Sequence, residues 1–150
     1  MNILPATQQT APEIISLLHR HYSSLNNEYL FEKYQLDFRS HPLVKRSSAE
    51  EGYTFFAMRN DEEEVIGYIS TTRNDNLGEI VEVVFSDETI ARQHCQKLLD
   101  TAIADLKEHG VTQLYFRLTQ QNRVVQQILE QKYHAKTLAI EGGVDLRNLP

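Results

Sequence analysis

Two carboxylates interrupt an apolar run near the middle of the sequence. Glu79 precedes the segment Ile80 to Phe85, and Glu82 lies within it. The β-branched composition of this segment is typical of a strand buried on both faces. Successive residues of a strand point to opposite faces, so we expect Glu82 to share a face with Ile80 and Val84. A carboxylate among apolar neighbours is partly desolvated, which suits a general base. Glu82 is therefore the candidate base, or alternatively a rim carboxylate paired with a lysine or arginine, while Glu79 is interpreted as a solvated edge residue.

A polar turn follows this strand and begins a long helix. Residues 86–89, Ser-Asp-Glu-Thr, favour helix caps. The apolar residues that follow recur at three- and four-residue steps on one stripe: Cys95, Leu98, Leu99, Ala102, Ile103 and Leu106. Gly110 suits the left-handed position after a helix end. A helix that begins beyond a central strand gathers open N–H groups and the positive end of its dipole, so the sequence predicts an anion site there.

Nucleophilic and metal chemistry are less well supported. Cys95, the single cysteine, lies near a helix start, which can activate a thiol, but its place in the apolar stripe favours a small core residue. His19 and His21 point to different sides of a helix, and the other four histidines are scattered, so no metal site is predicted. One cysteine also excludes an internal disulfide and fits a reducing compartment, from which we expect a cytoplasmic protein.

Length and composition limit the class of protein. The 150 residues, 41% of them hydrophobic, suit a single domain over 1–150. A net charge of −6 argues against a nucleic-acid surface. No apolar run approaches the roughly 18 residues that cross a bilayer, and the first residues lack the pattern of a signal peptide. We expect neither nucleic acid nor a membrane as partner.

Periodicity predicts a mixed α/β fold around the central strand. The expected strands lie at residues 2–6, 53–58, 65–72, 77–85, 111–118 and 137–146, and the expected helices at 11–25, about 29–38, after 89 and after 122. Thr10-Ala-Pro-Glu13 indicates a capping box at the first helix. Short polar turns make the strands from 53 to 85 an antiparallel meander, and the crossover through the long helix makes the next strand parallel. Residues 26–51 are either a helix with a surface loop or a lid or acceptor-binding wall.

This order of elements resembles the GNAT family of acyl-CoA N-acyltransferases over nearly the whole chain. The resemblance rests on VIGYI from Val65, EIVEVVFSDETIARQHCQKLLDTAIADLKEHGVTQLYFRL from Glu79, and QQNRVVQQILEQKYH up to His134. It implies a central mixed sheet of about six or seven strands with about four helices, and acetyl-CoA as acyl donor. It also implies that the coenzyme A pyrophosphate lies at the helix start and the pantetheine in a gap beside the core strand. By position, the backbone of Val83, Val84 and Phe85 would bind the pantetheine, and Asn122 matches a recurrent asparagine.

The phosphate loop departs from the family pattern, Arg/Gln-x-x-Gly-x-Gly/Ala. The aligned residues are Ile90, Ala91, Arg92, Gln93, His94 and Cys95, followed by Gln96 and Lys97. The family glycines permit close approach of backbone to phosphate, whereas Gln93 brings a side chain to that place. Arg92, His94 and Lys97 would still offer positive charge. An ordinary helix cap is the alternative interpretation of this segment.

The family's proton donor is also replaced. Many members carry a tyrosine that reprotonates the departing thiolate, and the matching position here is Leu129. Tyr133 lies one turn later on the same face, either as a substitute acid or as a packing residue with a wet hydroxyl. Glu82 matches a position that is often acidic in the family, and would accept the proton of an amine whose reference pKa is about 10.4.

Two functional interpretations follow from the resemblance. The first is an acyl-CoA-dependent N-acetyltransferase, in which a primary amine of a small molecule or peptide attacks the thioester directly. The second is a GNAT-like domain that no longer catalyses transfer and acts as a coenzyme-sensing or protein-interaction module. Both are compatible with a monomer or a homodimer.

Overall fold

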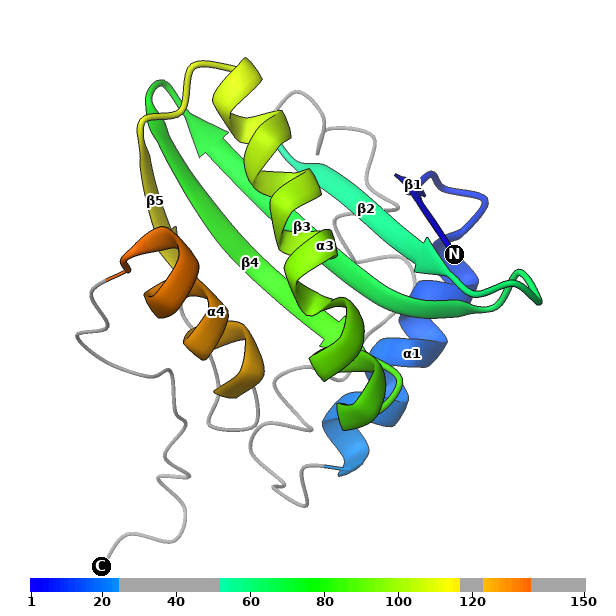
Figure 1. Cartoon of the computed structure of the whole chain (residues 1–150). Coiled ribbons are helices and arrows are strands. Elements are labelled where there is room, and N and C mark those ends of the chain that lie inside the picture. The colour runs from blue at the N-terminus through cyan, green and yellow to red at the C-terminus, as the bar shows by residue number, and fades with distance from the viewer. Residues whose placement is uncertain (25–51, 117–122, 136–150) are drawn as a thin grey trace, which may run out of the picture.

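A five-stranded sheet in the order β1-β2-β3-β4-β5 forms the centre of the protein (Figure 1). The computed structural model describes residues 1–24, 52–116 and 123–135, with side chains of the first segment described to residue 21. The strands are β1 (Asn2–Pro5), β2 (Thr54–Arg59), β3 (Val65–Asn74), β4 (Leu77–Phe85) and β5 (Gln113–Phe116). The helices are α1 (Ala11–Ser24), α3 (Glu88–Glu108) and α4 (Arg123–Tyr133).

The topology is the one that the periodicity predicts. Strands β1 to β4 pair in antiparallel fashion, and β4 pairs with β5 in parallel after the crossover through α3. The mixed sheet and its flanking helices confirm the predicted fold class. The second helix expected near 29–38 and the strand expected at 137–146 lie outside the described residues, and the single domain over 1–150 stays a prediction.

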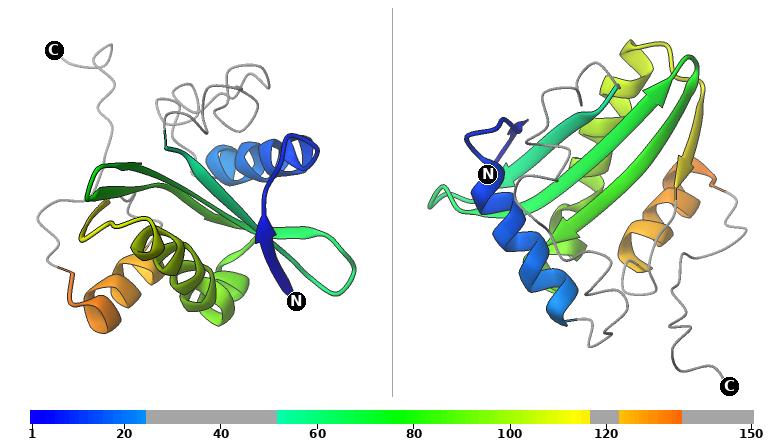
Figure 2. Two further views of the ribbon diagram at one scale, coloured as in Figure 1. Left: turned by 90° about the horizontal axis from the view of Figure 1, so that it is seen from above. Right: turned by 180° about the vertical axis from the view of Figure 1, so that it is seen from behind.

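Helices cover both faces of the sheet and produce two hydrophobic clusters. Helix α1 lies on one face, and α3 and α4 lie on the other (Figure 2). On the α1 face, Ile14, Leu17 and Leu18 pack against residues of β2, β3 and β4 that include Tyr68 and Val84. On the opposite face, the predicted stripe of α3 packs against the sheet and α4. None of the described helices is long and apolar enough to span a bilayer.

A β-bulge in β4 changes which residues share a face. Ser70 pairs with Glu82 and Thr71 pairs with Ile80, so Val81 is the additional residue of β4. The expectation that Ile80 shares a face with Glu82 and Val84 was wrong. Ile80 packs on the α3 face, whereas Val84 packs on the α1 face. The bulge inserts one residue and therefore reverses the alternation between Ile80 and Glu82.

The start of α1 also differs from its sequence signature. The Thr10 hydroxyl donates to the carbonyl of Thr7 at 2.8 Å and accepts from the Thr7 amide at 3.0 Å. Glu13 pairs with Arg59 of β2, with N–O distances of 3.0 and 3.1 Å. The capping box expected from Thr10 and Glu13 does not form, because both side chains have other partners.

Candidate active site

The carboxyl end of β4 extends beyond the described part of its parallel neighbour, β5. Pairing with β5 runs from Leu77 opposite Gln113 to Ile80 opposite Phe116, whereas pairing with β3 continues to Phe85 opposite Gly67. Among the described residues, the last five positions of β4 therefore have no partner on the β5 side. Figure 1 shows β4 leading into the start of α3. Val83, where the resemblance implies the pantetheine, lies beyond the last described residue of β5.

The first turn of α3 is open to solvent and capped by a carboxylate. Asp87 is the N-cap, and its Oδ1 accepts a hydrogen bond from the Ile90 amide at 2.8 Å. Residues 86–89 are all exposed. Within the described part of the chain, the amides of Glu88 and Thr89 have no recorded acceptor. This end can receive an anion through open amides and the helix dipole, but the negative charge of Asp87 lies beside it.

The residues aligned with the family's phosphate loop are helical. Residues 90–97 all belong to α3, so from Arg92 onward their amides bond within the helix rather than to a ligand. The side chains of Arg92, Gln93, Gln96 and Lys97 are exposed, those of Ile90, Ala91 and His94 are half-buried, and Cys95 is buried. The Arg92 guanidinium lies 2.6 Å from the Glu88 carboxylate, which offsets part of its positive charge. Any role of these residues in binding coenzyme would therefore fall to their side chains.

Cys95 has the properties of a core residue. Its side chain is fully buried in the cluster between α3 and the sheet. Burial raises the pKa of the Cys95 thiol to about 12, so almost no thiolate exists at neutral pH. Nucleophilic catalysis by this thiol is thus disfavoured.

Glu82 belongs to a polar group on the α1 face of the sheet. The polar cluster, as we call it, consists of His21 on α1, Tyr53 before β2, Tyr68 and Ser70 on β3, and Glu82 on β4. Glu82 is half-buried and pairs across the strands with Ser70, which is buried. Burial raises the pKa of Tyr68 well above its usual value, and the Glu82 carboxylate adds to this, while the Ser70 hydroxyl acts in the opposite direction. The predicted base thus lies among buried hydroxyl groups and a histidine.

His21 was not recognised as a site residue from sequence. Burial lowers the pKa of its imidazole below the usual 6.5, and the charge of Glu82 partly opposes that shift. The only local signal was a pair of histidines in the last turns of the first helix. Their relation to Glu82 depends on how α1 packs on the sheet and on the bulge in β4, neither of which periodicity reveals.

Tyr133 lies on the opposite face of the sheet, bonded to α3. Its hydroxyl donates to Oδ1 of Asp100, and Lys132 Nζ lies 2.7 Å from the other carboxylate oxygen. Burial raises the pKa of Tyr133, and the bond to Asp100 raises it further. Asp100 is thirteen residues beyond the cap at Asp87, about 20 Å along the helix axis. Leu129, at the family's tyrosine position, is buried.

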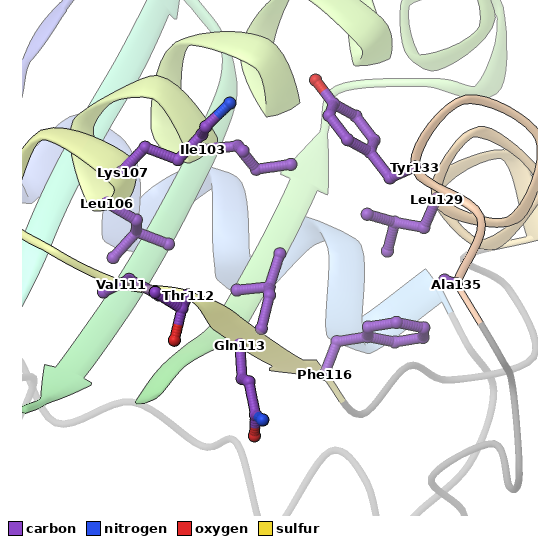
Figure 3. Close-up of a pocket in the computed structure, with 11 residues that line it drawn as sticks. Ile103, Leu106, Lys107, Val111, Thr112, Gln113, Phe116, Leu129, Tyr133 and Ala135 are labelled. Carbon is purple, nitrogen blue, oxygen red and sulfur yellow. The ribbon is translucent and has the colours of Figure 1, made fainter. Parts of the chain in front are cut away.

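A cavity of about 510 Å³ lies between the C-terminal half of α3, β5 and α4. Leu129, Tyr133 and Phe116 line it together with Leu106 and Val111, as Figure 3 shows. None of its lining residues belongs to the predicted coenzyme segment 83–97. Asn122, the remaining predicted contact, lies outside the described residues. Within the described ranges, no three His, Cys, Asp or Glu side chains form a group that could hold a metal ion.

The fold is shared with solved acetyltransferase structures. It superposes on a GNAT acetyltransferase from Staphylococcus aureus Mu50 with a TM-score of 0.71 and 17% identity, covering 99% of this chain and 89% of that one. It superposes on PaiA N-acetyltransferase from Thermoplasma acidophilum, in complex with coenzyme A, with a TM-score of 0.67 and 18% identity. The superposition covers 88% of this chain and 89% of that one. It superposes on ribosomal-protein-alanine N-acetyltransferase from Brucella melitensis biovar Abortus with a TM-score of 0.65 and 13% identity, covering 97% of this chain and 100% of that one.

Sequence comparison gives the family directly. A comparison with curated proteins found no match. The family model described as "Acetyltransferase (GNAT) family" matches residues 12–133, which include α1 except its first residue, the meander, α3, β5 and α4. This match extends over most of the 150 residues. The chain therefore belongs to the GNAT acetyltransferase family.

Proposed function

We propose that this protein is an acetyl-CoA-dependent N-acetyltransferase that acts on a primary amine. The single observation that best supports this is the direct passage of β4 into α3, whose first turn is exposed to solvent. Family membership supports the same activity class. The related fold of PaiA N-acetyltransferase was solved with coenzyme A, which supports acetyl-CoA as the donor here.

The residues of the chain fit the parts of coenzyme A in different degrees. The extended backbone of Val83 to Phe85 suits the amides of a pantetheine, which need extended hydrogen-bonding partners. The open amides of Glu88 and Thr89 suit a phosphate oxygen. Lys97 adds positive charge in the third turn of α3, whereas Asp87 opposes an anion.

Glu82 would serve as the general base. An alkylammonium must lose a proton before its nitrogen can attack the thioester carbonyl, and the half-buried carboxylate can accept that proton directly or through water. A backbone N–H of β4 near Val84 would stabilise the negative charge that develops on the carbonyl oxygen. Tyr133 would reach the departing thiolate only after leaving Asp100, so we propose a packing role for it.

The acceptor is a small-molecule or peptide amine in this proposal. An acidic chain, with a net charge of −6, attracts cationic acceptors such as polyamines, aminoglycosides or lysine side chains. We propose that the protein works in the cytoplasm as a monomer or homodimer, without nucleic acid or membrane as partner.

Two features favour a second candidate, a GNAT domain without transferase activity. The start of α3 has a carboxylate cap at Asp87, and the nearby Arg92 is paired with Glu88. Both features weaken the attraction for a diphosphate. Such a domain would act in coenzyme sensing or protein interaction.

Two measurements separate the candidates. Acetyl-CoA at about 100 times its Kd should stabilise the fold by about 2.7 kcal/mol, seen as a rise in melting temperature. Release of coenzyme A thiol should then depend on an added amine. The Glu82→Gln variant should lose turnover but keep its affinity for acetyl-CoA, whereas Glu79→Gln, a matched change on the same strand, should keep both. A melting temperature unchanged by acetyl-CoA and by coenzyme A would favour a protein-interaction domain, whereas a rise without amine-dependent release of thiol would favour coenzyme sensing.

A further inference from the structure

The cavity between α3, β5 and α4 has an apolar interior. Most of its described lining residues are apolar, and Leu106, Val111 and Leu129 among them are buried. Ile103 and Phe116 are only half-buried, so part of their apolar surface faces the cavity of about 510 Å³. Figure 3 shows Ile103 and Leu129 pointing toward one another across it. A cavity of this size and composition is typical of sites for small organic molecules.

The ends of two helices fix the walls of the cavity. Gly110 follows α3 with a left-handed φ of 84°, and the Val111 amide donates to the Leu106 carbonyl at 3.1 Å. At the end of α4, the Ala135 amide donates to the Leu129 carbonyl at 3.0 Å. Each of these bonded residues lines the cavity. A ligand can therefore enter without rearrangement of these two helix ends.

A set of polar contacts holds α4 against α3 beside the cavity. Lys132 Nζ lies 2.7 Å from Oδ2 of Asp100, and the Tyr133 hydroxyl donates to the other carboxylate oxygen. The Tyr133 ring lines the cavity, and Lys132 Nζ lies 5.6 Å from the centre of that ring. Because Asp100 and Lys132 neutralise one another, neither presents an unpaired charge to a molecule in the cavity.

Lys107 supplies the charge of the described lining, which contains no aspartate or glutamate. Its side chain is exposed, and a lysine stem packs on apolar surface while its ammonium stays in water. The residues three and four positions before it are Ala104 and Ile103, so its own helix supplies no ion pair there. The cavity thus has one positive charge at the edge of an apolar interior. A molecule with an apolar body and a single carboxylate is complementary to this arrangement.

We propose that this cavity binds a small apolar carboxylic acid, with its hydrocarbon body between α3, β5 and α4 and its carboxylate beside Lys107. The site is separate from the start of α3, where the coenzyme is proposed to bind. Ile103 is sixteen residues beyond Asp87, about 24 Å along the helix axis. The acid and the coenzyme should therefore bind at the same time. Binding of the acid does not depend on the proposed transferase activity.

Octanoate is the probe, and binding is followed by the amide NMR spectrum of the full chain near neutral pH. Titration to about 10 mM should give saturable shifts at Ile103, Phe116 and Leu129, with a Kd of about 1 mM or tighter. Octanol has the same chain without the charge and should bind about threefold more weakly, the size of an exposed ion pair. The amides of residues 83–89 should not shift with either probe.

Two variants and a matched control separate charge from shape. Lys107→Met keeps an apolar stem without the ammonium, so octanoate should bind about threefold more weakly and lose its preference over octanol. Ile103→Trp places an indole in the cavity and should abolish saturable binding of both probes. Arg123→Met removes an exposed positive charge from the start of α4, outside the lining, and should leave both affinities unchanged. Melting temperatures check folding, and Ala135→Trp is a second blocking variant if Ile103→Trp is unstable.

Four outcomes would overturn the proposed site. They are the absence of saturable shifts, shifts confined to residues 83–89, equal affinity of the wild type for octanoate and octanol, and unchanged binding in both tryptophan variants. Nuclear Overhauser contacts from residues 136–150 to the Ile103 methyl groups that persist in octanoate would also overturn it, because the chain itself would then fill the cavity. A protein that binds octanoate here but transfers no acetyl group would keep this site and lose the proposed function.

Discussion

The carboxylate cap of α3 makes the sharpest prediction about coenzyme affinity. Asp87→Asn removes one negative charge and keeps the hydrogen bond to the Ile90 amide, because asparagine and aspartate are equally good N-caps. The free energy of unfolding should therefore change by less than about 0.5 kcal/mol. The variant therefore removes the charge of residue 87 while leaving the geometry of the helix start unchanged.

The magnitude follows from the geometry of the first turn. A phosphate bound to the amides of Glu88 and Thr89 would lie within about one helical pitch, ~5 Å, of the Asp87 carboxylate. Two unit charges at that distance repel by about 1 kcal/mol in water, and by about 3 kcal/mol at an effective dielectric constant of 20. Because the site is exposed, we adopt the lower value, which is about a fivefold gain in affinity for coenzyme A.

The assay is calorimetric titration of coenzyme A at low ionic strength, with Asp75→Asn as the matched control. Asp75 is exposed in the turn between β3 and β4, at a left-handed φ of 53° that asparagine also adopts. The nine residues of β4 separate it from α3 by about 27 Å. The gain in Asp87→Asn should shrink at 1 M salt, where the Debye length is about 3 Å. Equal affinities of the two variants at low salt would refute the placement of the diphosphate at this helix start.

Three further outcomes follow from the contacts and pKa shifts. Tyr133→Phe should lower the free energy of unfolding in urea by about 1–2 kcal/mol, because Asp100 loses a hydrogen bond. The same variant should keep kcat within about twofold of the wild type. A large fall in kcat with normal folding would instead assign Tyr133 a role in the chemistry. The pKa of His21 is lower in the folded protein than the unfolded value of 6.5, so the unfolded chain binds more protons and stability should fall as pH drops from about 7.5 through 6.5. The same titration in His21→Gln should be flatter, and an identical slope would argue against a buried neutral imidazole. Cys95 should resist iodoacetamide at pH 8 until the chain is unfolded in urea, and labelling of the folded protein would contradict its raised pKa.

Periodicity predicted the elements that bury a continuous apolar stripe. Cys95, Leu98, Leu99, Ala102 and Leu106 are all buried, as their spacing in the sequence indicated. The long helix forms one face of the core, so its pattern is set by local spacing alone. The meander was predicted from the short polar turns between its strands, and the parallel pairing from the long helix between its two strands. Both signals are local in the sequence.

Features that depend on pairing between distant residues were not predictable. The bulge at Val81 comes from the register of β3 against β4, and it places Ile80 on the face opposite to Glu82. Thr10 and Glu13 matched a capping box, but Glu13 found a partner 46 residues away in Arg59. The buried environment of His21 depends on the packing of α1 over β4, which local sequence does not reveal. Local sequence therefore described the scaffold better than the polar cluster it carries.

Hydrogen exchange at the junction of β4 and α3 tests the central claim most directly. The amides from Val83 to Thr89 should exchange more slowly when the protein is saturated with acetyl-CoA, because the end of β4 and the open helix start would both gain acceptors or lose contact with water. The amides of the turn between β3 and β4 should be unaffected. Unchanged exchange from Val83 to Thr89, with protection confined to another part of the chain, would contradict the placement of the coenzyme at this junction.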